Sequence, residues 1–251
     1  MIEKDFIYSK IKQNKFLIIG RAGVDIYPDP PGVKIENAKK YVTYLGGSSA
    51  NIAVAISKLG GKCDIFTTVP DDALGNYALN QLNNYGVGTK LIKRIKGESK
   101  ISFAVVETTN IDHQSIIYRN NASDFFVEKE DVDKINFNDY SCIINAGTSL
   151  SSEPSRTSTL EAFKIAKKNQ LLIIMDIDFR PYVWENKKVT SNVYREAIEY
   201  CDIIVGNENE FGIICNEPEN SLEFAKNLSK DSKMVIYKMG SKGSITFFNK
   251  E

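Results

Sequence analysis

The chain has 251 residues, of which 42% are hydrophobic and 25% are charged, as is ordinary for a soluble globular protein with a large core. Lysine plus arginine and aspartate plus glutamate both number 32. This balance gives no electrostatic reason for binding nucleic acid or an anionic membrane, so we expect neither as a partner.

The N-terminal stretch MIEKDFIYSKIKQNK is too charged for a signal peptide, and no apolar run is long enough to span a bilayer. The cysteines at positions 63, 142, 201 and 215 form no Cys-x-x-Cys pair, and a single histidine argues against a zinc cluster. Three of these cysteines begin or lie in apolar, strand-like runs. They fit buried free thiols, which predicts a reducing, cytoplasmic location.

The first predicted strand is Lys15 to Arg21, with Asp25 just after its end. Residues 28–38 are rich in proline, glycine and polar side chains and predict a loop. Residues 39–45 look extended and lead into a glycine pair, Gly46 and Gly47.

A helix is predicted after the glycine pair. Ser48 and Ser49 are candidates for its N-cap, and its buried stripe would be Ile52, Ile56 and Leu59. Because glycine has no Cβ, a ligand could lie directly on the backbone at Gly46 and Gly47, within reach of Asn51 in the first helical turn. A buried strand-turn-helix corner explains the same residues equally well.

Residues 62–69 predict a second strand, followed by a helix that Gly86 closes. Residues 89–119 then alternate with a period of two and predict an antiparallel hairpin, with His113 in its polar turn. Arg119 ends this hairpin, where it could close over a polar ligand. A solvated strand end is the alternative for Arg119.

The remaining chain alternates between helices and apolar strands, which predicts parallel βαβ units in a doubly wound α/β sheet. The expected strands are residues 141–145, 170–177, 201–205, 234–238 and 244–248. Ligands of such sheets bind beyond the carboxyl ends of the strands. The polar residues at these ends are therefore site candidates: Asp25, Asp178, Arg180, Asn207, Glu210 and Lys238.

Three short patterns at these ends suggest anion chemistry. Arg180 could clamp a carboxylate or a phosphate, or could form only a salt bridge with Asp178. Asn207 and Glu210 open a helix, where an acidic residue is favoured anyway, but they could also handle Mg²⁺ through water.

Lys238 lies between two short strands, together with Gly240 and Gly243. The two glycines would let phosphate approach the backbone, and the lysine would supply a positive charge. A hairpin turn needs glycines as well, so the pattern has a purely structural alternative.

Seven segments together resemble the ribokinase-like (PfkB) carbohydrate kinase family, in the family's order. They are GRAGVD, GGSSANIAVAISKLG, VPDDALGNYALNQLNNYGV, YRNNASD, DIDFRPYVW, IIVGNENEF and VIYKMGSKGS. The resemblance implies a single ribokinase-like domain over residues 1–251. It also implies an antiparallel β lid from about residues 25–45 and 96–120, through which a homodimer could form.

The segments YRNNASD and DIDFRPYVWEN are most similar to those of family members that act on sugar acids. The resemblance implies ATP- and Mg²⁺-dependent phosphorylation of 5-dehydro-2-deoxy-D-gluconate, as in inositol catabolism, with 2-keto-3-deoxygluconate as the rival substrate. A nucleoside kinase of the same fold is a further alternative, against which the two arginines argue.

The resemblance also implies a role for each candidate residue. The substrate side would comprise Asp25, Gly46, Gly47, Asn51, Arg119, Asp178 and Arg180. The nucleotide and Mg²⁺ side would comprise Asn207, Glu210, Lys238, Gly240 and Gly243, with no direct metal ligand among them. We expect the glycines and the two arginines to converge on one small acidic sugar.

The Gly-Ala-Gly-Asp turn that supplies the family's catalytic base does not occur in this sequence. The resemblance therefore implies a fold truncated at its C-terminus, with no catalytic base before Glu251. A non-catalytic sugar-acid-binding fragment is an alternative to the kinase on this account.

Overall fold

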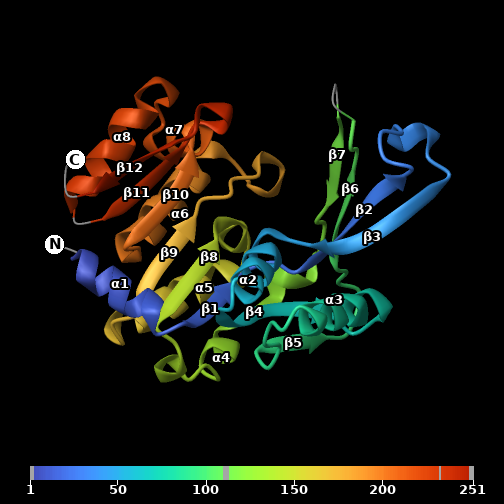
Figure 1. Ribbon diagram of the computed structural model, residues 1–251, viewed down its shortest axis with the longest axis horizontal. Helices are drawn as coiled ribbons and strands as arrows, with labels where there is room; N and C mark the ends of the chain where they lie inside the picture. Colours follow the sequence, from blue (N-terminus) through green and yellow to red (C-terminus); the bar gives the residue numbers. More distant parts are fainter. Residues whose placement is uncertain (1–2, 110–112, 232, 249–251) are drawn as a thin grey trace. The chain divides into compact units, whose positions relative to one another are not determined.

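The computed structural model describes residues 3–109, 113–231 and 233–248 (Figure 1). The chain divides into two compact units, of which unit 1 is Met1–Ile19 with Glu128–Glu251 and unit 2 is Gly20–Val127. The prediction that residues 1–251 form a single domain stays a prediction.

Unit 1 contains a mostly parallel sheet in the order β12-β11-β10-β9-β8-β1. Its strands are β1 (Lys15–Ile19), β8 (Cys142–Ala146), β9 (Leu172–Asp176), β10 (Ile203–Asn207), β11 (Met234–Lys238) and β12 (Ser244–Phe248). Only the β11–β12 pair among these is antiparallel. The predicted parallel α/β arrangement is therefore confirmed, and the carboxyl ends of β8 to β11 share one edge.

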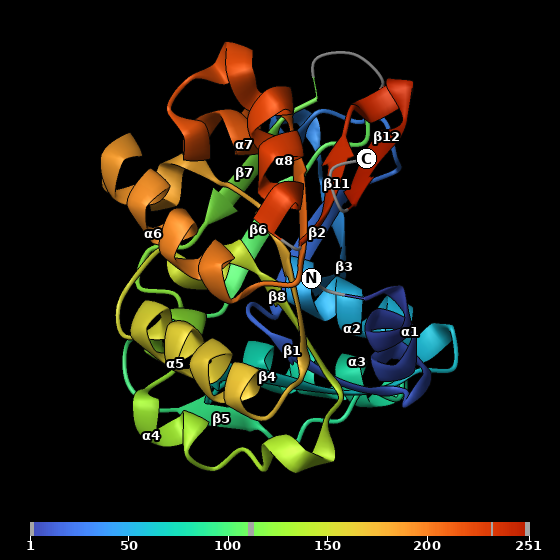
Figure 2. The ribbon, with the colours of Figure 1, turned by 90° about the vertical axis from the view of Figure 1, so that its left-hand side faces the viewer.

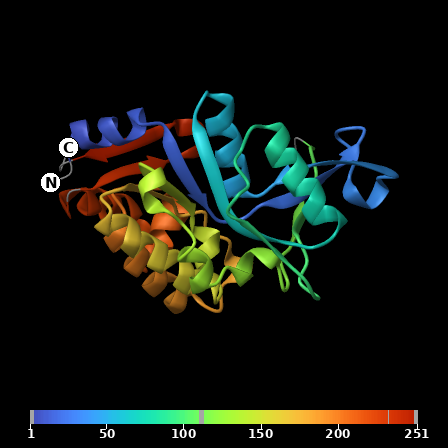
Figure 3. The same cartoon turned by 90° about the horizontal axis from the view of Figure 1, so that it is seen from below.

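Helices cover both faces of this sheet, as Figures 2 and 3 show. They are α1 (Lys4–Lys12), α4 (Lys129–Val132), α5 (Ser155–Lys168), α6 (Lys187–Tyr200), α7 (Glu208–Cys215) and α8 (Ser221–Leu228). The sequence analysis did not predict α1, whose Ile7 packs with Cys142, Leu172 and Ile203. Figure 3 shows α1 on the face opposite α5 and α6.

Unit 2 contains a parallel strand pair and a second, mainly antiparallel sheet. The pair is β4 (Lys62–Pro70) with β5 (Ile92–Ile95). The second sheet has the order β3-β2-β6-β7, with β2 (Gly23–Asp29), β3 (Lys40–Gly46), β6 (Ser102–Val106) and β7 (Ser115–Tyr118). Helices α2 (Ser48–Lys58) and α3 (Ala73–Asn84) complete the unit.

The second sheet brings together the two segments predicted to form a lid. Strands β6 and β7 pair as the predicted antiparallel hairpin, with Phe103 opposite Tyr118. The prediction of a loop over residues 28–38 is wrong at its start, because β2 continues to Asp29 through its pairing with β3. Strand β5 was also missed, since residues 89–119 were taken as hairpin alone.

Helix α2 differs from its prediction in two respects. Its N-cap is Gly47, so Ser48 and Ser49 lie within the helix and do not cap it. Its buried residues are Ser49, Ala50 and Ala53, whereas Leu59 is 89% exposed. The predicted stripe of large side chains is wrong because α2 packs closely on β4 through small ones.

The buried thiols match the sequence-based expectation. Cys63, Cys142 and Cys201 are buried and free, and Cys215 is free and partly buried. Burial raises the pKa of Cys63 to about 11 and also raises the pKa values of Cys142 and Cys201, so these thiols stay protonated. Within the described ranges, no helix is long and apolar enough to cross a membrane.

Candidate functional site

Gly46 and Gly47, at the end of β3, lie so close to other atoms of the protein that a side chain at either position would clash with them. A Cβ on Gly46 would lie 2.1 Å from Asp25 Oδ1, so the carboxylate of Asp25 occupies the space that any larger residue would need. Asp25 lies within β2, directly opposite Tyr44 of β3. Asp25 does follow the first strand, β1, but the sequence analysis missed that it lies in a second strand, β2, which begins at Gly23.

Gly47 is constrained by the main chain of Arg21. A Cβ there would lie 2.5 Å from the Arg21 carbonyl oxygen, and the φ of +99° is itself one that glycine favours. The same carbonyl accepts a 3.2 Å hydrogen bond from the Ala50 N–H in the first turn of α2. The Arg21 side chain is 8% exposed and donates to Ser102 Oγ at 2.6 Å.

Burial raises the pKa of the Asp25 carboxyl, while the charge of Arg21 lowers it. The Asn51 side chain is exposed in the first turn of α2, and its backbone N–H donates to the Gly47 carbonyl at 2.9 Å. Unit 2 thus presents a half-buried carboxylate beside the glycine turn and an exposed amide on the helix that follows.

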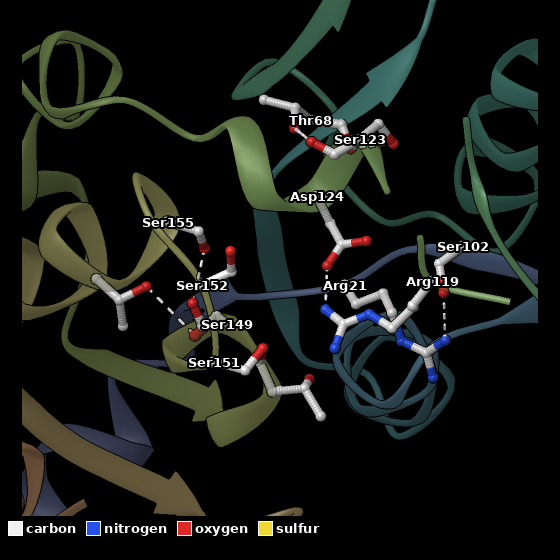
Figure 4. Close-up of polar contacts among 12 residues, drawn as sticks. Arg21, Thr68, Ser102, Arg119, Ser123, Asp124, Ser149, Ser151, Ser152 and Ser155 are labelled. Atoms are coloured by element: carbon white, nitrogen blue, oxygen red, sulfur yellow. Dashed lines mark hydrogen bonds and ion pairs between the residues drawn. The ribbon is translucent and has the colours of Figure 1, made fainter. Parts of the chain in front are cut away.

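Arg119 lies in the interior of unit 2 and is 5% exposed. Its guanidinium forms an ion pair with the buried Asp124 (Figure 4). It also stacks over the Phe125 ring, 4.3 Å from the ring centroid. Asp124 thus already neutralises the positive charge of Arg119, which the sequence analysis expected to pair with the carboxylate of a ligand. Contact between Arg119 and a ligand stays a prediction.

Asp178 and Arg180 form the salt bridge that their spacing suggested, with 2.7 Å between Arg180 Nη2 and Asp178 Oδ1. Asp178 is buried and has a φ of +42°, an uncommon backbone conformation for aspartate. Its Oδ2 has no hydrogen-bond partner among the residues that the structure describes. The Arg180 side chain is 41% exposed, and its Nη1 donates to the Phe179 carbonyl at 3.1 Å.

Asn207 and Glu210 form a capping box at the N-terminus of α7. The Asn207 side chain accepts a hydrogen bond from the Glu210 N–H, and Glu210 Oε2 accepts one from the Asn207 N–H at 2.7 Å. Glu210 Oε1 also accepts from the Phe179 N–H at 3.2 Å, which ties the loop after β9 to α7. The predicted helix start at this pair is confirmed.

Lys238 links two carboxylates at the carboxyl ends of β9 to β11. Its Nζ lies 3.1 Å from Asp176 Oδ1 and 3.8 Å from Glu210 Oε2. The sequence analysis did not select Asp176, although it ends β9 two residues before Asp178. Because residues two apart along a strand point to the same face, the choice of Asp178 could have led to Asp176 as well.

The turn after Lys238 borders a hollow of about 520 Å³ in unit 1. Gly240 and Gly243 have φ values of +58° and +91°, and the space where each would carry a Cβ is open. The hollow is lined by Asn207, Glu208, Asn209, Glu219, Ser221, Leu222, Tyr237, Lys238, Met239, Gly240 and Lys242. It therefore combines the start of α7, two lysines and an accessible glycine, as a polyphosphate site would.

No group of three or more His, Cys, Asp or Glu side chains is arranged to hold a metal ion in the described part of the chain. Mg²⁺ usually keeps several waters and is held by one or two carboxylates together with substrate phosphates. Asp176 and Glu210 fit this second kind of site.

The pKa of the Glu210 carboxyl is raised mainly by burial, against the hydrogen bond from Asn207 N–H and the charge of Lys238. The folded state therefore holds this proton more tightly than the unfolded state. The resulting stabilisation is present at low pH and is lost as the pH rises through the pKa of the folded state.

We expect Glu210→Gln to lose this part of the pH dependence. Urea unfolding between about pH 4 and pH 8 should show a smaller decline in the free energy of unfolding for Glu210→Gln than for the wild type. Glu208→Gln, at an exposed position of the same turn, is the matched control and should follow the wild type. Parallel wild-type and Glu210→Gln curves would contradict the expectation.

Comparison with known proteins gives a consistent result. A family model described as pfkB family carbohydrate kinase matches residues 13–251. A Mesomycoplasma hyopneumoniae protein named 5-dehydro-2-deoxygluconokinase is 34% identical over 240 residues, which are 93% of this chain and 71% of the relative.

Two solved structures share the fold. The 2-dehydro-3-deoxygluconokinase of Thermotoga maritima has a TM-score of 0.83 and 20% identity, covering 94% of this chain and 78% of that one. A Vibrio cholerae fructokinase double mutant with bound fructose, ADP and potassium has a TM-score of 0.80 and 21% identity, covering 95% and 74%. The ribokinase-like fold is thereby confirmed.

Proposed function

Because the chain belongs to the pfkB family of carbohydrate kinases, which transfer phosphoryl groups to an alcohol oxygen, we propose that it phosphorylates a sugar acid with ATP as the donor. The proposed acceptor is 5-dehydro-2-deoxy-D-gluconate, which would place the reaction in inositol catabolism and in the cytoplasm. The 34% identity to a relative named for this activity, over 93% of the chain, carries the proposal. The alternative acceptor is 2-keto-3-deoxygluconate.

On the acceptor side, we assign sugar hydroxyls to Asp25, Asn51 and the backbone of Gly46 and Gly47. A carboxylate accepts hydrogen bonds from several hydroxyls, and the Asp25 carboxylate already lies against the glycine turn. We assign the carboxylate of the sugar acid to Arg119 and Arg180, of which Arg180 has the exposed guanidinium.

On the donor side, we assign the phosphates of ATP to Lys238, Gly240 and Gly243, beside the hollow in unit 1. Asp176, Asn207 and Glu210 would hold hydrated Mg²⁺, which neutralises phosphate charge when bound. Lys238 already forms ion pairs with Asp176 and Glu210. Phosphoryl transfer depends mainly on positioning and electrostatics, and we assign the role of catalytic base to no residue of this chain.

A coupled assay of ADP release tests this function. The panel comprises 5-dehydro-2-deoxygluconate, 2-keto-3-deoxygluconate, fructose and adenosine, and we expect the highest kcat/KM with the first. Lys238→Met should lower the rate with every acceptor, which separates the activity of this chain from that of a contaminating kinase.

Isothermal titration calorimetry on the same preparation separates the remaining alternatives. Binding of the sugar acid without ADP release would favour a non-catalytic sugar-acid-binding protein. The absence of both binding and ADP release with either sugar acid would refute the proposed function. A homodimer through the β3-β2-β6-β7 sheet stays a prediction for sedimentation analysis.

A further inference from the structure

One face of the β3-β2-β6-β7 sheet carries two tyrosines beside Asp25. Tyr44 lies directly opposite Asp25 across the β2–β3 pair, and Tyr27 is two residues further along β2 on the same face. The rings of Tyr27 and Tyr44 meet edge to face, with centroids 5.6 Å apart and an interplanar angle of 74°. A carboxylate and two phenol rings thus lie next to one another on one face of the sheet.

The two tyrosines border a hollow of about 420 Å³ within unit 2. Val42, Asp29 and Thr108 also line it, so its wall is mainly aromatic and aliphatic with a few polar atoms. Small-molecule sites have this size and composition. The Tyr44 side chain is 54% exposed, which leaves much of its surface available to a ligand.

The core of unit 2 does not depend on this face of the sheet. Residues of the opposite face, Ile26, Leu45 and Phe103, pack with Val24, Ala78 and Ile101. Tyr27 and Tyr44 point the other way, because side chains alternate along a strand. Burying a core is therefore not the reason for two aromatic rings next to Asp25.

The electrostatics of these three side chains suit hydrogen bonding to a polar ligand. Burial raises the pKa of Tyr27, and the charges of Asp25 and Tyr44 raise it further. The phenol therefore stays protonated and can donate a hydrogen bond, while the Asp25 carboxylate accepts from hydroxyl groups. A ligand with both hydroxyl groups and C–H surface matches this combination.

We propose that Tyr27 and Tyr44 form an aromatic wall of the acceptor site, which packs against the carbon chain of the sugar acid while Asp25 binds its hydroxyl groups. This inference rests on the proposed function. It adds two residues that determine how the acceptor is oriented. It also predicts that polyhydroxylated acids bind here in preference to nucleosides.

Calorimetry with 5-dehydro-2-deoxygluconate and, separately, with ATP tests the inference on the full chain. Tyr44→Ala should weaken sugar-acid binding by about tenfold or more and leave ATP binding unchanged. Tyr44→Phe should lose less, because it keeps the ring. Tyr41→Ala is the matched control, since Tyr41 is 41% exposed on the same strand but faces the other side of the sheet.

The outcomes separate the inference from the function on which it rests. If the wild type binds no sugar acid, both are refuted. If the wild type binds but Tyr44→Ala behaves like Tyr41→Ala, with both folded by circular dichroism, the aromatic wall is refuted and the proposed function stands. A loss confined to ATP binding would likewise refute the aromatic wall.

Discussion

Replacing Gly46 by alanine is expected to weaken binding of the acceptor sugar acid by about 10- to 100-fold. The added methyl group would lie 2.1 Å from Asp25 Oδ1, so the carboxylate has to leave its position. Hydrogen bonds to a charged group contribute about 1.5–3 kcal/mol each, which corresponds to that range of affinity. Calorimetry with 5-dehydro-2-deoxygluconate measures the change.

A double-mutant cycle shows whether Gly46 acts through Asp25. In an Asp25→Ala background the extra methyl group meets no carboxylate, so Gly46→Ala should cost little further affinity. Additive losses would contradict this, and would mean that the backbone of Gly46 contacts the ligand by itself. The cycle therefore distinguishes an effect of Gly46 through Asp25 from a direct contact between the Gly46 backbone and the ligand.

Replacing Tyr194 by alanine is expected to lower the free energy of unfolding of unit 1 by about 3–5 kcal/mol. Tyr194 is fully buried, its ring centroid lies 5.1 Å from that of Trp184, and its hydroxyl donates to the Ile177 carbonyl at 2.8 Å. Gly147 fits against the same ring, since a Cβ there would lie 2.7 Å from it. Loss of the ring leaves a cavity at the carboxyl ends of β8 and β9.

Tyr194→Phe is the control, because it keeps the ring and removes only the hydroxyl. The Ile177 carbonyl then loses this donor, at a cost of about 1–3 kcal/mol. Urea unfolding of both variants, followed by circular dichroism, gives the comparison. Equal losses in the two variants would show that the hydrogen bond, and not packing, carries the contribution of Tyr194.

The sequence predicted unit 1 well because its signals are local. Apolar strands alternate with amphipathic helices, and the Asn207 and Glu210 side chains cap α7 within a single turn. The family and the class of enzyme were also predicted correctly, because several motifs occur in a fixed order. Each of these patterns can be read within one stretch of chain.

Unit 2 was predicted less well because its decisive contacts lie far apart in sequence. Asp25 belongs to a strand because Gly23 to Asp29 pair with β3, and Gly23 pairs with Ser102 of β6. The buried face of α2 carries small residues because of β4, which periodicity within α2 does not reveal. The convergence of Asn51, Arg119 and Arg180 on one ligand stays a prediction.

The three contacts of the Glu210 carboxylate limit which residues position 210 can accept. One carboxylate holds the start of α7 through Asn207, the loop after β9 through Phe179, and an ion pair with Lys238. Aspartate is one methylene shorter and glutamine carries no charge, so each substitution forfeits part of this arrangement. Position 210 therefore has little room for neutral drift.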